Sequence, residues 1–177
     1  MLKMFSTQLT GLFKRIEEKE EFAFEDGARL LAQAPVGDGS IYIFGEAEMK
    51  AVEFEAIAGA EPLNGAKALS LVLIDQLTEA DRAVLFTRTS SDEAAVAVAT
   101  ALQDKGIPFV AVSTVMDDTA AGDLAELADV HIDLRLKKGL LPDDLGNRFG
   151  YPSSMAALYV YFGLKFTIDE ILADYFE

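Results

Sequence analysis

Residues 83–93, AVLFTRTSSDE, join a short apolar run to a polar segment that is rich in hydroxyl groups. Residues 83–86 have the length and composition of a strand that is buried on both faces. The alanine-rich residues from about 92 to 105 have the composition of a helix. A buried strand that leads into a helix predicts one half of a βαβ unit, the unit from which parallel sheets are built.

The same alternation continues on both sides of this stretch. Further strands are predicted at residues 40–45, 109–113 and 130–134, and further helices at residues 49–57 and 123–127. One more strand stays undecided in the segment that follows the helix at 49–57. It lies either near residues 60–63 or within residues 69–74, because the periodicity there does not distinguish the two.

Helices are also predicted at both ends of the chain, where apolar residues recur at three- and four-residue spacing. They cover about residues 2–16, 22–34, 153–164 and 168–176. The charged run over residues 14–21 is expected to close the first of them. Residues 137–152 have the composition of a loop, and Thr167 with Glu170 fits a capping box that would start the last helix.

Together these elements predict an α/β fold, a three-layer αβα sandwich with a mostly parallel sheet of about five strands. The chain has 177 residues, close to the usual size of one domain. We therefore expect a single domain over residues 1–177, in which N-terminal helices (residues 1–35) precede an α/β core with C-terminal helices (residues 36–177).

The composition argues against several classes of function. A formal net charge of −15 disfavours binding to nucleic acid or to anionic membranes, which requires clustered lysine and arginine. No apolar run approaches the ~20 residues of a membrane span. The chain has no cysteine, which excludes disulfides and thiol nucleophiles and fits a reducing compartment, so a cytoplasmic location is expected. With one histidine, a zinc site of the His/Cys type cannot form, and we predict no metal and no cofactor.

The polar segment after residue 86 is the first candidate site, because ligands of doubly wound sheets bind outside the carboxyl ends of the strands. With the free N–H groups of the next helical turn, five residues would form a phosphate cradle: Thr87, Arg88, Thr89, Ser90 and Ser91. The alternative is a plain helix start, since Ser90 and Glu93 match a capping box. Asp92 and Glu93 also suit the positive end of a helix, and they would repel a phosphate.

The second candidate is the segment Gly45-Glu46-Ala47-Glu48, which follows the first strand. Gly45 permits a tight turn, and Glu46 or Glu48 could act as a general base on a sugar carbon. The alternative is an acidic helix start that the helix dipole favours.

The third candidate combines a late loop and the start of the helix at residue 153. Arg148 could close over a ligand, and Ser153 or Ser154 could offer hydroxyl groups. The alternative is a solvated arginine and an ordinary N-cap. His131, the one histidine, lies within a predicted strand, and we expect it to be bonded to backbone on the sheet face or in the core rather than to be catalytic.

Three common motifs of other α/β proteins are absent from the sequence. No G-x-G-x-x-G follows a strand, which disfavours a dinucleotide-binding domain. The absence of G-x-x-x-x-G-K-[ST] and of G-x-S-x-G disfavours a P-loop NTPase and an α/β-hydrolase.

In order and spacing, these segments resemble the SIS family of phosphosugar isomerases and sugar-phosphate-binding regulators. In that family a strand ends in a G-x-G-x-S turn, and a later strand leads into an S-x-S-G-x-T-x-E loop that holds a sugar phosphate. Phe44-Gly45 matches the first motif and residues 87–93 match the second; residues 106–114 and 128–132 resemble the strands that follow. The resemblance covers about residues 22–164 and extends to small bacterial SIS-like proteins of the phosphoheptose isomerase type.

The sequence departs from the family motifs at four positions. Ala47 and Met49 stand where the family has its second glycine and its serine, and Ser90 and Asp92 stand where the loop has glycine and threonine. Phosphoheptose isomerases of this kind use a glutamate and a histidine as acid and base, but the late helices here contain no histidine. The resemblance therefore implies the fold, a phosphorylated sugar as ligand and a homodimer or higher homo-oligomer, and it does not carry over the isomerase reaction.

Three hypotheses follow for the function. The first is phosphosugar binding by the cradle at residues 87–91, with Arg88 assisting. The second is an aldose–ketose phosphosugar isomerase with Glu46 or Glu48 as the base. The third is a non-catalytic, dimeric interaction or regulatory domain. Its dimer contact would be an apolar stripe that could equally pack on the core of its own chain: Leu2, Phe5, Leu9, Leu12 and Ile16.

Overall fold

The computed structural model describes residues 1–117 and 121–176, and its centre is a five-stranded sheet with the strand order β2-β1-β3-β4-β5. The strands are β1 (Ile41–Gly45), β2 (Ala66–Ala68), β3 (Arg82–Thr89), β4 (Phe109–Thr114) and β5 (Val130–Asp133). All four pairings are parallel. The predicted α/β fold with a parallel sheet is therefore confirmed, and the strands predicted at residues 40–45, 83–86, 109–113 and 130–134 are present.

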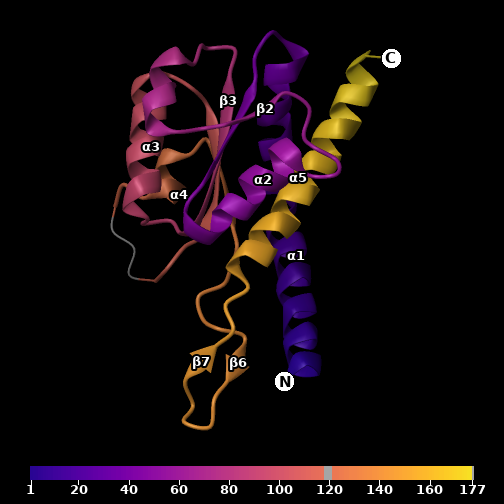
Figure 1. Cartoon of the computed structure of the whole chain (residues 1–177), viewed down its shortest axis with the longest axis vertical. Helices are drawn as coiled ribbons and strands as arrows, with labels where there is room; N and C mark the ends of the chain where they lie inside the picture. The colour runs from indigo at the N-terminus through magenta and orange to yellow at the C-terminus, as the bar shows by residue number, and fades with distance from the viewer. Residues whose placement is uncertain (118–120, 177) are drawn as a thin grey trace.

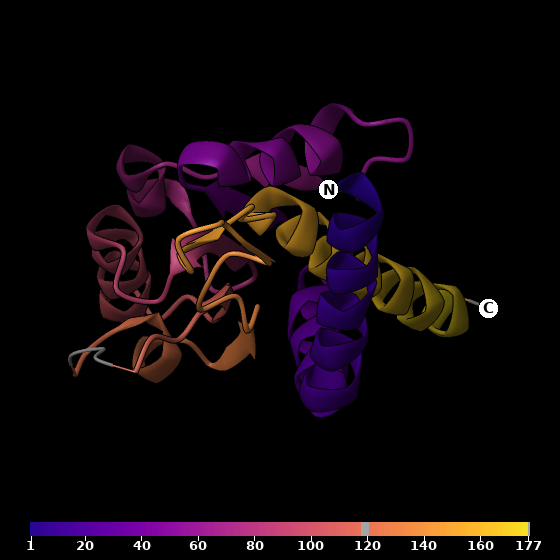
Figure 2. The ribbon, with the colours of Figure 1, turned by 90° about the horizontal axis from the view of Figure 1, so that it is seen from below.

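Helices cover both faces of the sheet (Figure 1). One face carries α1 (Leu2–Val36), α2 (Lys50–Ala58) and α5 (Ser153–Phe176), and the other carries α3 (Glu93–Asp104), α4 (Leu124–Leu127) and the 3-10 helix η2 (Leu71–Gln76). Figure 2 shows the two helical layers on opposite sides, with α1 and α5 crossing on one of them. No helix among residues 1–117 and 121–176 is long and apolar enough to cross a membrane.

The central strands are apolar on both faces because each face meets its own core. In β3, Val84 and Phe86 belong to the core beneath α1, α2 and α5, whereas Ala83 and Leu85 belong to the core beneath α3. This double burial produces the continuous apolar runs from which these strands are predicted.

The N-terminal segment forms one helix of 35 residues, so the prediction of two helices is wrong. The charged run at residues 14–21 lies in the middle of α1, because lysine and glutamate are good helix formers and do not end a helix. Within the same turns, Leu12 and Ile16 are fully buried and fix one face of α1 on the sheet. Figure 1 shows the first half of α1 extending below the sheet.

The C-terminal segment also forms one helix, α5, where two helices are predicted. The Thr167 hydroxyl donates to the carbonyl oxygen of Gly163 at 3.0 Å, so it bonds backward within the helix and does not cap a new one. Gly163 is required at this point because a Cβ there would lie 2.5 Å from the ring of Phe24 on α1.

The second strand lies at neither predicted place. β2 (Ala66–Ala68) pairs with residues 41–43 of β1, and residues 69–74 lead into η2. The edge strand is three residues long and partly exposed, so it lacks the apolar signature of a buried strand. The predicted loop at residues 137–152 contains a two-stranded hairpin, β6 (Leu141–Pro142) and β7 (Arg148–Phe149).

Candidate functional site

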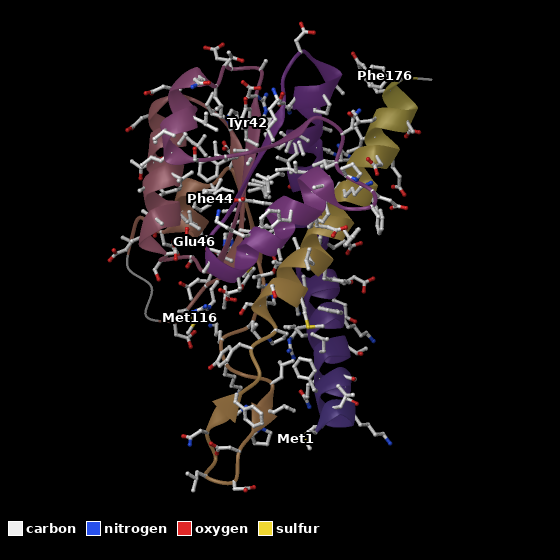
Figure 3. All side chains as sticks on the ribbon, in the orientation of Figure 1. Met1, Tyr42, Phe44, Glu46, Met116 and Phe176 are labelled. Atoms are coloured by element: carbon white, nitrogen blue, oxygen red, sulfur yellow. The ribbon has the colours of Figure 1, made fainter. Side chains whose placement is uncertain are left out.

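The first two candidate segments meet at the carboxyl ends of the neighbouring strands β1 and β3. Gly45 is the partner of Phe86 in the parallel pairing, and the backbone N–H of Glu46 donates to the carbonyl oxygen of Phe86 at 3.1 Å. Figure 3 shows Tyr42, Phe44 and Glu46 following one another down β1 toward this edge, where Met116 also follows β4. The sheet therefore brings together loops that are about forty residues apart in the sequence.

The turn after β1 is tight. A Cβ at Gly45 would lie 2.4 Å from the backbone oxygen of Met49, so only glycine fits there without a shift. The Gly45 N–H donates to Oε1 of the buried Glu53 at 2.7 Å, which ties the turn to α2. Ala47 begins the 3-10 helix η1 (Ala47–Met49) and has φ = 50°, in the left-handed region that disfavours a side chain. The position of the second family glycine thus keeps a glycine-like conformation with an alanine in it.

Arg88 and Glu48 form an ion pair that bridges the two loops. Nε and Nη2 of Arg88 donate to Oε1 and Oε2 of Glu48, each at 2.8 Å. The hydrogen bonds from Arg88 lower the pKa of the Glu48 carboxyl below its ordinary value, and they raise the pKa of the guanidinium. The pair is largely solvated, with 63% of the Arg88 side chain and 32% of the Glu48 side chain exposed.

The predicted phosphate cradle is divided between the interior and the surface. β3 continues to Thr89, so residues 87–89 belong to a strand and not to a loop, although the register shifts after Phe86. Thr87 and Ser90 are fully buried, and the Thr87 hydroxyl donates to the carbonyl oxygen of Thr89 at 2.7 Å. Ser90 is held between elements, because its N–H donates to Thr114 and its carbonyl oxygen accepts from Leu124.

On the surface side, Arg88 and Ser91 are exposed and Thr89 is half-buried. These three residues are the members of the predicted cradle that solvent can reach. The buried Ser90 hydroxyl has no hydrogen-bond partner among the described residues.

The first turn of α3 is capped by a carboxylate. Oδ1 of Asp92 accepts a hydrogen bond from the Ala95 N–H at 2.9 Å, and Asp92 is the N-cap residue. The capping box predicted from Ser90 and Glu93 is therefore wrong, because β3 and its turn extend farther than predicted and the helix begins at Glu93. A negative charge already interacts with the positive end of this helix, which weakens the case for a phosphate on its N–H groups.

Two adjoining cavities share the Arg88–Glu48 pair. The larger cavity, of about 510 Å³, is also lined by Tyr151 and Ser154 from the chain entering α5. The smaller cavity, of about 190 Å³, has a polar lining: Glu46, Ala47, Glu48, Arg88, Thr89 and Asp92. Among the described residues that line the two cavities, Arg88 is the one cation.

The third candidate segment contributes in part. Ser154 lines the larger cavity, whereas Ser153 is buried at the start of α5. Arg148 points its guanidinium at its own hairpin, donating to the carbonyl oxygens of Gly139 and Leu140 at 2.9 and 2.8 Å. Tyr151 was not predicted as a lining residue; its place directly before the proline that precedes α5 is the one sequence signal that could have drawn attention to it.

His131 lies elsewhere on the sheet. Its Nε2 is 2.7 Å from the hydroxyl oxygen of Ser113 on β4, so its partner is a side chain and not the predicted backbone group. Burial lowers the pKa of His131, although Asp133 and Asp123 act in the opposite direction. Within the described residues, His131 lines neither cavity, and no group of three His, Asp or Glu side chains is arranged to hold a metal ion.

Comparison with sequence families gives one match over nearly the whole chain. The sequence model of the family described as "Domain of unknown function (DUF2529)" matches residues 1–172. Among curated proteins, the chain is 45% identical over 175 residues to "Uncharacterized protein YwjG" of Bacillus subtilis (strain 168), and the match covers 99% of each chain.

Several solved structures share the fold at low sequence identity. The Vibrio vulnificus NanR protein complexed with ManNAc-6P superposes with a TM-score of 0.73 at 12% identity; the match covers 98% of this chain and 64% of NanR. E. coli CFT073 c3406, in complex with a sugar phosphate, gives 0.66 at 12% identity, over 98% and 93% of the two chains. The sugar isomerase domain of the RpiR transcription factor from Sphaerobacter thermophilus gives 0.64 at 12% identity, over 99% and 94%. The predicted SIS fold is therefore confirmed.

Proposed function

The chain belongs to the family described as a domain of unknown function (DUF2529) and has the SIS fold, and from this premise we propose that it binds a small phosphorylated sugar at the carboxyl ends of β1 and β3. The phosphate group would lie against Arg88 in the larger cavity, and the sugar hydroxyls would face Tyr151 and Ser154. We treat residues 1–177 as one domain in this proposal, because α1 and α5 share a core with the sheet.

The observation that carries the proposal is the position of one exposed guanidinium at a cavity on the carboxyl edge of a parallel sheet. Ligands of such sheets bind at this edge, and arginine binds phosphate through two parallel hydrogen bonds. The larger cavity, about 510 Å³, lies within the range of small-ligand pockets. Its other polar groups, the hydroxyls of Tyr151 and Ser154, can both donate to and accept from a sugar hydroxyl.

The ligands of two proteins of this fold point to the same chemistry. NanR is complexed with ManNAc-6P, and c3406 is also in complex with a sugar phosphate. At 12% identity these two structures establish the fold, and the ligand class comes to this chain as part of the proposal.

The structure also limits which residues of the predicted cradle take part. Arg88, Thr89 and Ser91 are accessible, whereas Thr87 and Ser90 are fully buried, so we assign the latter two to the support of the strand end. Gly45 is assigned to the turn, because its N–H is already bonded to Glu53.

The proposal is for binding without proton transfer. A general base acts best with a pKa near the working pH, and the hydrogen bonds from Arg88 move the pKa of Glu48 in the wrong direction for this role. Glu46 stays the candidate base of the isomerase alternative. If the protein isomerises its ligand, Glu46→Gln abolishes the exchange of the sugar C1 or C2 proton with solvent, which NMR in D₂O measures; unchanged exchange removes Glu46 from consideration.

The test of the proposed function is calorimetry with a panel of aldose and ketose phosphates of five to seven carbons. We expect saturable binding of at least one member and a loss of at least about tenfold in affinity for Arg88→Gln, since hydrogen bonds to charged groups contribute about 1.5–3 kcal/mol. Arg29→Gln is the matched control, because Arg29 forms an exposed pair with Glu25 on α1. No binding of any sugar phosphate at millimolar concentration would overturn the proposal.

We also propose a homodimer or higher homo-oligomer and a cytoplasmic location. Leu12 and Ile16 of the apolar stripe pack in the core of their own chain, whereas Leu2 and Met4 at the tip of α1 are 78% and 50% exposed. Only the tip is therefore free to contact a second copy. If it does, Leu2→Lys with Met4→Lys lowers the mass measured by light scattering; an unchanged mass excludes the tip as the interface. The location rests on the absence of cysteine, which a reducing compartment allows.

A further inference from the structure

The Arg88–Glu48 pair places a carboxylate where the proposed function needs a phosphate. Both oxygens of Glu48 accept hydrogen bonds from Arg88, one from Nε and one from Nη2. A phosphate uses the same two-point geometry on an arginine. A phosphorylated ligand that enters the larger cavity therefore meets a guanidinium whose donors are already engaged.

We propose that Glu48 is an internal competitor for the anion site: it holds Arg88 in the ligand-free protein and is displaced when a phosphate group takes its place. The inference rests on the proposed function and adds the regulation of that site. It makes Glu48 a determinant of specificity, because an anion must compensate for the lost pair with contacts of its own. Inorganic phosphate has no further groups for the cavity, whereas a sugar phosphate also reaches the hydroxyls of Tyr151 and Ser154.

The exposure of the pair makes displacement feasible. Solvent reaches 63% of the Arg88 side chain and 32% of the Glu48 side chain, and ion pairs with such exposure are weak because water and salt screen them. A released Glu48 carboxylate would be hydrated at once, so its departure leaves no buried charge.

The turn that carries Glu48 adds a second reason. Ala47, the residue before Glu48, has φ = 50° and is exposed. A non-glycine residue in this conformation is strained, and the same residue reaches the ordinary helical and extended regions at no cost. The pairing of Glu48 with Arg88 is thus made from a turn that has lower-energy conformations available to it.

The surroundings confine the anion to one side of the pair. Glu46 and Asp92 line the smaller cavity, and Oδ1 of Asp92 stays bonded to the Ala95 N–H. These carboxylates repel a phosphate on that side. The larger cavity, lined by hydroxyls beyond the pair, is the side on which a phosphate can replace Glu48.

The test is a titration of inorganic phosphate and of fructose 6-phosphate into the wild type, Glu48→Gln, Arg88→Gln and the double variant at constant ionic strength. We expect Glu48→Gln to bind inorganic phosphate about three- to tenfold more tightly, as removal of a weak competing pair and of a like charge predicts. The gain disappears in the double variant, because it acts through Arg88. Since fructose 6-phosphate makes further contacts, it binds the wild type more tightly than inorganic phosphate does.

Glu25→Gln is the matched control, because it makes the same change in net charge at a remote exposed pair on α1. A similar gain in this control would mean that the general negative field of the protein was responsible, and it would overturn the inference. So would equal or weaker phosphate binding by Glu48→Gln while Arg88→Gln abolishes binding, a result that leaves the proposed function standing. Absence of binding of either probe to every variant would overturn both.

Discussion

Two arginine–glutamate pairs of this fold have the same chemistry and different settings. Arg135, just after β5, donates from Nε to Oε1 of Glu20 on α1 at 2.8 Å, and its Nη2 donates to the same oxygen. Arg88 donates from the same two nitrogens, but to both oxygens of Glu48. The Glu20 side chain is 9% exposed and joins α1 to the sheet, whereas the Glu48 side chain is 32% exposed and borders two cavities.

The difference teaches that burial, more than geometry, separates a pair that holds the fold from a pair that a ligand can exchange. When one partner of a buried pair is removed, the other keeps an uncompensated charge away from water. When one partner of an exposed pair is removed, the other is hydrated. Both pairs lie beside backbone with positive φ, at Arg135 itself (54°) and at Ala47 (50°), so local strain does not distinguish them.

The largest expected effect breaks the buried pair. Glu20→Gln should lower the free energy of unfolding by about 3 kcal/mol, at the low end for a buried ion pair because Arg135 is partly exposed. Glu48→Gln, the matched change at the exposed pair, should cost less than about 0.5 kcal/mol. Urea titrations measure both. Equal losses for the two variants would contradict the distinction between them.

The next effect concerns the turn that aims Glu48 at Arg88. Gly45→Ala should cost about 2 kcal/mol, because the added Cβ meets the Met49 backbone oxygen and only a backbone shift can relieve the contact. The shift moves η1, so binding through Arg88 changes as well. Gly11→Ala on α1 is the control: a Cβ there meets nothing within 4 Å, and alanine should stabilise the helix. A Gly45→Ala variant as stable as the wild type would show that the turn is softer than the structure indicates.

The sequence predicts the part of the fold in which both faces of a strand are buried. β1, β3, β4 and β5 give continuous apolar runs because two cores contact them. β2 escapes prediction because an edge strand of three residues, Ala-Lys-Ala, pairs through its backbone and leaves little pattern in its side chains. The lengths of α1 and α5 escape for the opposite reason: tertiary packing at Ile16 and Gly163 carries each helix through a segment whose local signals favoured an end.

The sequence predicts the residues of the site better than their relations. Glu48 and Arg88 each follow a strand and are predicted as candidates, but their pairing depends on a strand neighbourhood that spans 40 residues of sequence. The cap of α3 passes from Ser90 to Asp92 because β3 runs three residues farther than its apolar part. β-branched threonines continue a strand as readily as they form a loop, and composition does not separate the two cases.

A smaller effect tests the strain beside the exposed pair. Ala47→Gly should raise the free energy of unfolding by about 1 kcal/mol, because glycine adopts φ = 50° without the steric cost that alanine has. Ala97→Gly, an exposed position within α3, should lower it by about the same amount, since there glycine only weakens a helix. Urea titrations of the two variants should therefore move in opposite directions. A loss of stability in both would mean that Ala47 carries no strain.

The smallest effect is the pH dependence of the exposed pair. The hydrogen bonds from Arg88 lower the pKa of Glu48 in the folded protein from 4.5, so as the pH falls the unfolded chain takes up this proton first. The contribution of the pair is therefore complete above pH 4.5 and is lost as the pH falls through the lower, folded-state pKa. The difference in stability between the wild type and Glu48→Gln should be below about 0.5 kcal/mol at pH 7, should shrink below about pH 4.5, and should also shrink in high salt because the pair is exposed.

Thermal unfolding of both proteins across this range measures the effect as a difference of about 1–2 °C in Tm. A difference that is the same at low and neutral pH would show that Glu48 stabilises the fold through packing, and Arg88 would then be free to bind an anion without a competitor.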